Sequence, residues 1–364
     1  MPSTTTNGAD CAATAKTTIA GKYPMRFSVS NNFTFSRFDR RGVILGFDFI
    51  KMTNETKLTR FAKYCWFVLA YNLLVIIWGV FLRASKSGDG CGMHWLTCHG
   101  EVVPSAPELK TVIEFSHRIT SALDGVIVIG LLLWTIVRWR GGSEPGRVLK
   151  AAIGSFVLVV IEGLLGAGLV LTGNTAENLT AARPFWMGAH LLTTLVLLAF
   201  LTFTAWFASG RPPFSFRVDG RTRGMIAAGV LAFLLVGMTG SIAALTNLLY
   251  PSNSIAEGIA KDFAESSNIL LRLRIAHPIV STLAALYLLL LVRHLRLLAP
   301  ASARTARLAR AASAAIIAQV AFGSLTLLML APILMQVGHL LLADFIWILL
   351  LMLTASALAE RDGD

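Results

Sequence analysis

Glu114 and His117 are the residues of this chain best suited to chemistry. They are three apart in Glu114-Phe-Ser-His-Arg118, so on a helix they lie on one face, one turn from each other. A carboxylate can move protons and an imidazole can bind a metal ion. Both lie at the start of an apolar run that continues to about Trp139. Ionisable groups inside a membrane are costly and usually line a pathway or a cofactor site.

Three further histidines lie in the same kind of position, near the start of a long apolar segment. They are His190 in Gly-Ala-His-Leu-Leu, His277 in Arg-Ile-Ala-His-Pro and His339 in Val-Gly-His-Leu-Leu. Two histidines at one depth on two helices of a bundle can provide both axial ligands of one haem iron. The sequence offers two such pairs, His117 with His190 and His277 with His339. A hydrogen-bonded interhelical histidine is the alternative for any one of them, but four in register favour ligation.

The segments that carry these residues read as membrane spans. Of the 364 residues, 55% are hydrophobic and only 14% are charged, and the mean hydropathy is +0.66. These values are typical of a polytopic membrane protein. A bilayer-spanning helix needs about 20 largely apolar residues. Eight segments meet this criterion: 61–83, 111–139, 148–172, 184–208, 223–249, 268–297, 306–331 and 335–358. The sequence therefore predicts an all-α integral membrane protein with eight transmembrane helices.

The net charge of +12 is spread over alternate connections between these spans. Lys and Arg gather before the first span and after the second, fourth and sixth, for example at Arg140, Arg221 and Arg304. This is the positive-inside pattern, so both termini are expected in the cytoplasm, and no nucleic-acid partner is expected. The four histidines then fall on even-numbered spans, at one level near the outer surface.

Two segments outside the spans have a distinct composition. Residues 1–60 are polar, basic and rich in Ser, Thr and Asn, which predicts a disordered cytoplasmic tail. The outer loop at 84–110 holds Cys91 and Cys98, with six residues between them. A disulfide is favoured on the oxidising side of a membrane. A metal site that adds the two histidines of this loop to the two thiols is the alternative.

The chain contains an internal repeat with a period of four spans. Glu-Phe-Ser-His117 in the second span matches Arg-Ile-Ala-His277 in the sixth, and the histidine stretches of the fourth and eighth spans also match. An even period relates the two halves by an axis along the membrane normal. The prediction is two pseudo-symmetric four-helix bundles, an N-terminal half at 61–210 and a C-terminal half at 211–364.

The repeat differs between the halves at the position one turn before the histidine. It is Glu114 in the second span and Arg274 in the sixth. A carboxylate there can act as a base or stabilise a developing cation, whereas an arginine can only hold an anion. The pattern therefore indicates a reactive N-terminal half and a structural or electron-transfer haem in the C-terminal half.

Other charged residues lie in or near the spans. Four arginines near the outer surface are candidate partners for haem propionates, with interfacial side chains that reach water as the alternative. They are Arg118, Arg183, Arg272 and Arg274. Three acidic residues are expected either in a proton path or as interhelical hydrogen-bond partners. They are Asp124, Glu162 and Asp344.

Together these residues resemble the haem A synthase family, membrane enzymes that convert haem O to haem A for terminal oxidases. The matching stretches are Cys98-His-Gly-Glu-Val-Val-Pro104, Ile113-Glu-Phe-Ser-His-Arg118 and the three later histidines with their flanks. The resemblance covers about 61–358. One loop departs from it, because Arg83-Ala-Ser-Lys-Ser-Gly88 stands where the family often has Arg-x-Thr-Gly-Ser-Gly.

The resemblance implies an oxidoreductase that turns a ring methyl of haem O into a formyl group by successive hydroxylations. The residues that it assigns are Glu114 as the catalytic carboxylate, His117 and His190 as ligands of the substrate haem O, His277 and His339 as axial ligands of a prosthetic haem b, and Cys91 with Cys98 as a disulfide. The expected partners are haem O, haem O synthase, an electron acceptor and the lipid bilayer, with homo-oligomerisation left open. The expected location is a bacterial plasma membrane.

Two other classes of protein fit parts of the sequence. A di-haem b-type membrane cytochrome that relays electrons to or from quinol would need the same four histidines, but it would not need a carboxylate at Glu114. A transporter built on a parallel repeat would explain the duplication, but not the register of the histidines. Haem content and the effect of replacing Glu114 therefore separate the synthase from the cytochrome.

Overall fold

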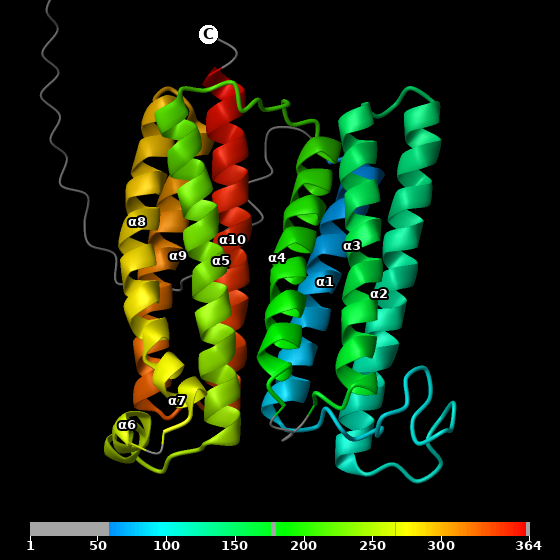
Figure 1. Ribbon diagram of the computed structural model, residues 1–364. Helices are drawn as coiled ribbons and strands as arrows, with labels where there is room; N and C mark the ends of the chain where they lie inside the picture. Colours follow the sequence, from blue (N-terminus) through cyan, green and yellow to red (C-terminus); the bar gives the residue numbers. More distant parts are fainter. Residues whose placement is uncertain (1–57, 176–179, 266, 362–364) are drawn as a thin grey trace, which may run out of the picture. The chain divides into compact units, whose positions relative to one another are not determined.

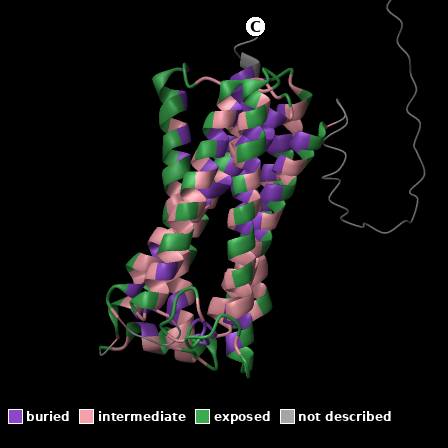
Figure 2. Ribbon diagram, turned by 90° about the vertical axis from the view of Figure 1, so that its right-hand side faces the viewer, coloured by how far each residue is buried: buried purple, intermediate pink, exposed green. Residues whose placement is uncertain are grey.

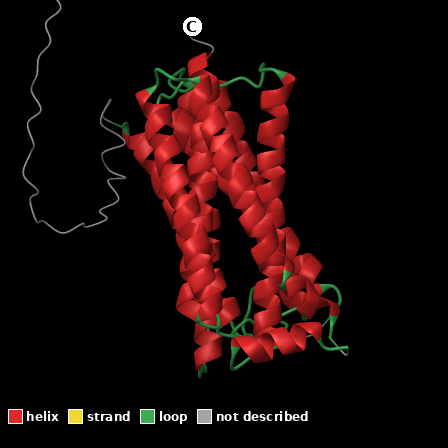
Figure 3. Cartoon of the chain, turned by 90° about the vertical axis from the view of Figure 1, so that its left-hand side faces the viewer, coloured by secondary structure: helices red, strands yellow, loops and turns green. Residues whose placement is uncertain are grey.

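The computed structural model describes residues 58–175, 180–265 and 267–361, and over these ranges its regular structure is helical (Figure 1). The helices are α1 Arg60–Ala84, α2 Leu109–Arg140, α3 Gly146–Leu171, α4 Arg183–Ala208, α5 Gly220–Leu249, α6 Ile255–Phe263, α7 Ile269–Arg274, α8 Ala276–Leu298, α9 Ala303–Leu328 and α10 Ile333–Arg361. Figure 3 shows these helices joined by loops, with no strand in the described part of the chain. Nearly all of the tail predicted at 1–60 lies outside the described residues, and Arg60 at its end is already helical.

In the described part of the chain, eight helical segments are long and apolar enough to cross a membrane, which agrees with the predicted number of spans. The seventh span differs in its bounds. The prediction is 306–331, whereas α9 runs from Ala303 to Leu328 and so both begins and ends earlier in the chain. It begins early because the hydroxyl of Ser302 accepts a hydrogen bond from the backbone of the first turn. It ends early because Leu330 and Ala331 both have positive φ, a conformation that an α-helix does not contain.

The sixth span is interrupted near its start. α7 and α8 together form the spanning segment Ile269–Leu298, and they are separated at Ile275. Pro278 has no N–H to donate to the carbonyl group of Arg274, four residues earlier. The interruption therefore lies where the missing hydrogen bond would have been.

The eight spans pack as two sets of four helices. α1, α2, α3 and α4 pack in chain order, and α1 also packs on α4, which closes the first set. α5, α8, α9 and α10 pack in the same order, and α10 contacts α5. Figure 1 shows the two sets side by side. The predicted fold class, an all-α membrane protein built from two four-helix bundles, is confirmed.

α4 and α10 join the two sets. α10 packs on both α1 and α4, and α4 packs on α5. The indole N–H of Trp347 in α10 donates to the carbonyl oxygen of Leu195 in α4 at 2.8 Å. The Trp347 ring also stacks on Phe233 of α5, with 4.9 Å between the centroids. This contact lies on the C-terminal side of the histidines in both α4 and α10.

Candidate functional site

The four histidines lie at equivalent levels of their spans. His117, His190 and His339 are six to eight residues from the first residue of α2, α4 and α10, and His277 is eight residues from the first residue of α7. These spans begin at the end of the molecule that carries the loop between α1 and α2 (Figure 1). We call it the disulfide end, because Cys91 and Cys98 of this loop form a disulfide.

Helix packing is looser around the histidines than at the opposite end. In α10, residues 335–343 are all half-buried, whereas residues 346–350 are all buried. In α4, residues 189–194 are half-buried, whereas most of residues 195–206 are buried. Figure 2 shows the buried residues gathered away from the disulfide end. Protein interiors are normally close-packed, so half-buried histidines between helices indicate room for a group that the chain does not itself supply.

The rings of His277 and His339 lie close together in the C-terminal half. Their ring centroids are 6.4 Å apart and their planes are inclined at 88°. An imidazole nitrogen binds a first-row metal at about 2 Å, so two imidazoles on opposite sides of one iron have centroids on the order of 6 Å apart. The observed spacing therefore fits a single haem iron between the two rings.

His117 and His190 occupy diagonally opposite helices of the N-terminal set, α2 and α4. Nδ1 of His117 is buried and has no hydrogen-bond partner among the described residues. The side chain of His190 is 39% exposed, so part of its ring remains open. Both rings are thus available to a ligand, as an iron between them would require.

Glu114 is buried and fixed at both carboxylate oxygens. Oε2 accepts the backbone N–H of Cys91 at 2.8 Å. Oε1 accepts an N–H from Nη2 of Arg118 at 2.5 Å. Only 3% of Glu114 is exposed, so burial of its charge is offset by these two charge-assisted hydrogen bonds.

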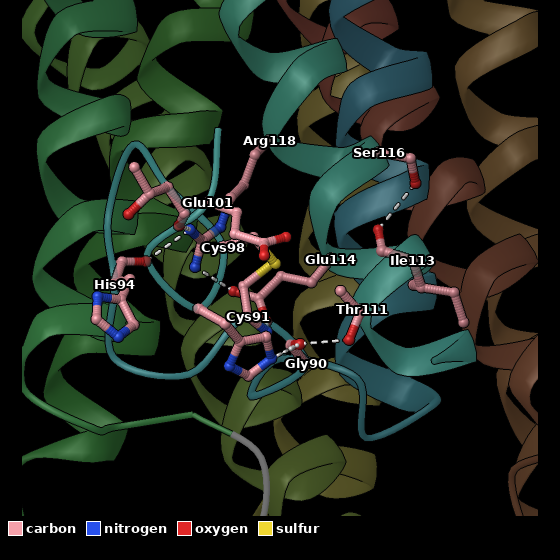
Figure 4. Close-up of a disulfide and its surroundings, with 12 residues drawn as sticks. Gly90, Cys91, His94, Cys98, Glu101, Thr111, Ile113, Glu114, Ser116 and Arg118 are labelled. Carbon is pink, nitrogen blue, oxygen red and sulfur yellow. Dashed lines mark hydrogen bonds and ion pairs between the residues drawn. A yellow bond between two sulfur atoms is a disulfide. The ribbon is translucent and has the colours of Figure 1, made fainter. Parts of the chain in front are cut away.

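The disulfide loop is attached to the first turns of α2 by several further hydrogen bonds (Figure 4). Nη1 of Arg118 donates to the carbonyl oxygens of His94 at 2.6 Å and Thr97 at 2.8 Å. The hydroxyl of Thr111 donates to the carbonyl oxygen of Gly90 at 2.6 Å. A Cβ atom at Gly90 would lie 2.4 Å from the backbone of Lys110, so only glycine allows this close approach.

The same loop bears on the two alternatives for Cys91 and Cys98. The disulfide agrees with the prediction and uses both thiols. Nε2 of His99 lies 2.8 Å from the carbonyl oxygen of Gly90. Among the described residues there is no group of three or more His, Cys, Asp or Glu side chains that could hold a metal ion. The structure therefore does not support a metal site built from the two thiols and His94 with His99.

The four arginines predicted as propionate partners have different surroundings. Arg118 is bonded to Glu114 and to the loop. Arg274 is bonded to Asp262 at 2.5 Å and to the Asn247 side chain at 2.9 Å. Arg183 is buried and Arg272 is exposed. The propionate roles stay predictions, and Arg118 and Arg274 would have to share their guanidinium groups with protein partners.

The three acidic residues whose roles were left open also differ. Oδ2 of Asp124 accepts a hydrogen bond of 2.6 Å from Asn72 in α1, which fits an interhelical hydrogen-bond partner. Oδ2 of Asp344 is buried without a hydrogen-bond partner among the described residues. Glu162 of α3 contacts both Nδ1 of His190 and the hydroxyl of Thr193 in α4. Of the three, Glu162 alone touches one of the four histidines.

Glycines that face the histidines were missed in the sequence. A Cβ atom would lie 3.0 Å from Cε1 of His117 if placed on Gly79, and 3.0 Å from Cε1 of His277 if placed on Gly240. Each glycine lies in the first span of its half. Extending the internal repeat to the first and fifth spans would have found them, because each glycine precedes its histidine by nearly the same number of residues.

Fold and site together define the class of protein. It is an all-helical, multi-pass membrane protein in which two pairs of histidines lie in two four-helix bundles, beside a disulfide loop. The chain belongs to the COX15-CtaA family, described as cytochrome oxidase assembly proteins, whose model matches residues 62–351.

Individual relatives carry two different names. A protein of Thermus thermophilus named "Protoheme IX farnesyltransferase" is 41% identical over 303 residues, which are 82% of this chain and 49% of that protein. A "Heme A synthase" of Halalkalibacterium halodurans is 40% identical over 131 residues, 36% of this chain and 42% of that protein. A "Heme A synthase" of Alkalihalophilus pseudofirmus is 37% identical over 131 residues, again 36% of this chain and 42% of that protein. The chain thus spans about half the length of the curated relatives that it matches.

Proposed function

We propose that this protein is a haem A synthase, which oxidises a ring methyl group of haem O to a formyl group. The observation that carries the proposal is the buried Glu114 carboxylate, one helical turn before His117 and fixed by Cys91 and Arg118. The corresponding Arg274 in the C-terminal half is paired with Asp262 instead. Only the N-terminal pair of histidines therefore has a carboxylate one turn before its first member.

In this proposal His117 and His190 bind the iron of haem O, which is the substrate. Each of two successive hydroxylations removes two electrons from the substrate, releases one proton from the carbon and one from a water molecule, and leaves the hydroxyl group of that water on the carbon. Loss of water from the resulting diol leaves the formyl group. Glu114 accepts a proton or stabilises positive charge on the macrocycle as these electrons leave. An external electron acceptor is needed, because protein side chains do not take up these electrons.

His277 and His339 would hold a prosthetic haem b in the C-terminal half, for which their 6.4 Å spacing is suitable. A haem there supplies one-electron redox chemistry when bound. The chain would contribute one nitrogen of each histidine and the glycines beside the rings. The absence of a carboxylate one turn before His277 is consistent with electron transfer rather than substrate oxidation at this pair.

Partners and location follow from the same proposal. One relative is named for the transfer of a farnesyl group to protohaem IX, and a farnesylated haem is the kind of substrate that this chain would receive. We therefore include a haem O synthase among its partners, together with the electron acceptor. Lys and Arg in alternate connections support a cytoplasmic location for both termini, and the bacterial relatives support a bacterial plasma membrane.

The test is extraction of the haems from the purified full-length protein, followed by chromatography and mass analysis. Haem B together with haem O, a hydroxylated haem O or haem A is the expected result. Two molecules of haem B per chain with no other haem would instead identify a di-haem cytochrome that relays electrons to or from quinol. No haem at all would contradict both.

A further inference from the structure

Glu162 places a carboxylate against one of the four histidines. It lies in α3, and its Oε2 atom contacts Nδ1 of His190 in α4. Its Oε1 atom accepts a hydrogen bond from the hydroxyl of Thr193, less than one turn further along α4. The Glu162 side chain is only 13% exposed. A carboxylate within a membrane span is costly. Because both oxygens of Glu162 contact side chains of α4, we expect the carboxylate to act on a residue of that helix.

The equivalent position in the C-terminal half holds an amide. Glu162 precedes Gly166 by four residues in the third span, and Gln319 precedes Gly323 by four residues in the seventh. Nε2 of Gln319 lies 3.3 Å from Nε2 of His339 and donates to the backbone carbonyl of that histidine at 3.0 Å. In both halves a side chain of the third span therefore contacts the histidine ring of the fourth, but at different ring nitrogens, Nδ1 of His190 and Nε2 of His339, and with different chemistry.

The remaining two histidines have neutral surroundings. Nδ1 of His277 lies 3.2 Å from the hydroxyl of Thr239. Nδ1 of His117 has no hydrogen-bond partner among the described residues. Within the described part of the chain, His190 is thus the one histidine of the four whose ring contacts a carboxylate.

A carboxylate at this place affects a metal ligand in a known way. A histidine that binds a metal commonly donates its other ring N–H to a carboxylate, which fixes the tautomer and makes the ligating nitrogen a stronger donor. An amide cannot do this as strongly, because it carries no charge. For haem iron, stronger axial donation stabilises the ferric state and is one of the protein's means of setting the reduction potential.

The contact allows this arrangement with a small movement. Nδ1 of His190 touches Oε2 of Glu162, but its N–H direction does not satisfy hydrogen-bond geometry. The His190 side chain is 39% exposed, so its ring can rotate to direct Nδ1–H at the carboxylate. Nε2 then points away from Glu162 and is free for iron.

We propose that Glu162 is a positioning residue that makes His190 the strongest axial donor of the four histidines, so that iron in the N-terminal half has a lower reduction potential than it would have with an amide at this position. The inference rests on the proposed function, because it takes His190 as an axial ligand. It assigns the difference between the two halves to one position, Glu162 in the first and Gln319 in the second.

The experiment exchanges these two side chains in the full-length protein, purified in detergent from cells that make haem O. Glu162→Gln and Gln319→Glu keep the shape of each side chain and exchange the charge. The midpoint potential of each haem is then measured by redox titration of its absorption bands. The N-terminal haem is identified as the one lost in His190→Ala, and the C-terminal haem as the one lost in His339→Ala.

The expected shifts are opposite in sign. Glu162→Gln raises the midpoint of the N-terminal haem by at least the equivalent of a tenfold change in the ferric-to-ferrous ratio, about 59 mV for one electron, and leaves the C-terminal midpoint unchanged. Gln319→Glu lowers the C-terminal midpoint. Thr193→Val, which frees the carboxylate from its hydroxyl partner, gives a smaller rise than Glu162→Gln. A role in folding alone would not move a midpoint potential while both haems remain bound.

Different results overturn the inference and the proposed function. If both haems are present and neither exchange moves a midpoint, the role of Glu162 is wrong while the haem assignment stands. If His190→Ala loses no haem, the assignment of His190 in the proposed function is wrong. If Glu162→Gln no longer binds the N-terminal haem, its midpoint potential cannot be measured and the test depends on Gln319→Glu alone. An unchanged midpoint potential of the C-terminal haem in Gln319→Glu then overturns the inference.

Discussion

Oε2 of Glu114 accepts the backbone N–H of Cys91 at 2.8 Å. This bond joins the carboxylate one turn before His117 to the disulfide loop between α1 and α2 (Figure 4). Arg118 strengthens the connection, because its guanidinium group bonds both Glu114 and two carbonyl groups of the loop. The position of the carboxylate therefore depends on the conformation of the loop.

Replacing Glu114 by Gln should block methyl oxidation without loss of the C-terminal haem. The amide keeps the size of the side chain and an acceptor for the Cys91 N–H, but it cannot accept a proton or stabilise a cation as a carboxylate does. Proton transfer by a positioned side chain is typically worth about 10² to 10⁴ in rate, so we expect a loss of that size. Haem A formed per unit of haem B in the purified variant measures it. Haem A at the wild-type ratio would rule out the catalytic role.

Opening the disulfide should weaken the same site through the loop. In Cys98→Ser the loop loses its covalent closure, and the Cys91 N–H is no longer held against Glu114. Removing a native disulfide commonly costs about 2–4 kcal/mol, and we expect lower thermal stability together with reduced haem A formation. The matched control is Cys65→Ala, which removes a free buried thiol from α1. Equal losses in the two variants would mean that the loop does not support the site.

The spans and the histidines could be predicted from the sequence because they follow from local rules. Apolar length sets a span, and a repeated histidine pattern needs only the chain order. The partner of Glu162 could not be predicted in this way, because it depends on how α3 packs against α4. The partner of Arg274 depends on how the short helix α6 packs against α7.

Added bulk beside a histidine should reduce haem binding in one half at a time. A Cβ atom at Gly323 would lie 2.7 Å from Cε1 of His339, and one at Gly79 would lie 3.0 Å from Cε1 of His117. Gly323→Ala must therefore displace the His339 ring and lower the occupancy of the C-terminal haem, whereas Gly79→Ala should affect the N-terminal haem, and less strongly. Haem-to-protein ratio measures both effects.

The control for these glycine variants is Gly125→Ala, in the same helix as His117. A Cβ atom there meets nothing within 4 Å. Alanine has the higher helix propensity by about 1 kcal/mol, so this variant should keep both haems and unfold at the same or a higher temperature. Haem loss in Gly125→Ala equal to that in Gly323→Ala would show that contact with the histidine ring is not the cause.

Breaking the ion pair between Asp262 and Arg274 should destabilise the C-terminal half. The pair is 2.5 Å long and both side chains are largely buried, and it holds α6 against α7, three residues before His277. Removing one partner of a buried pair costs about 3–5 kcal/mol, because the other charge is left without compensation. Asp262→Asn should therefore lower the unfolding temperature and loosen the C-terminal haem while the N-terminal haem stays bound.

Glu257→Gln is the matched control in the same short helix. The Glu257–Lys261 pair is more than one third exposed, and such pairs contribute roughly 0–1 kcal/mol to stability. Equal stability of the two variants would mean that the Asp262–Arg274 pair does not secure His277.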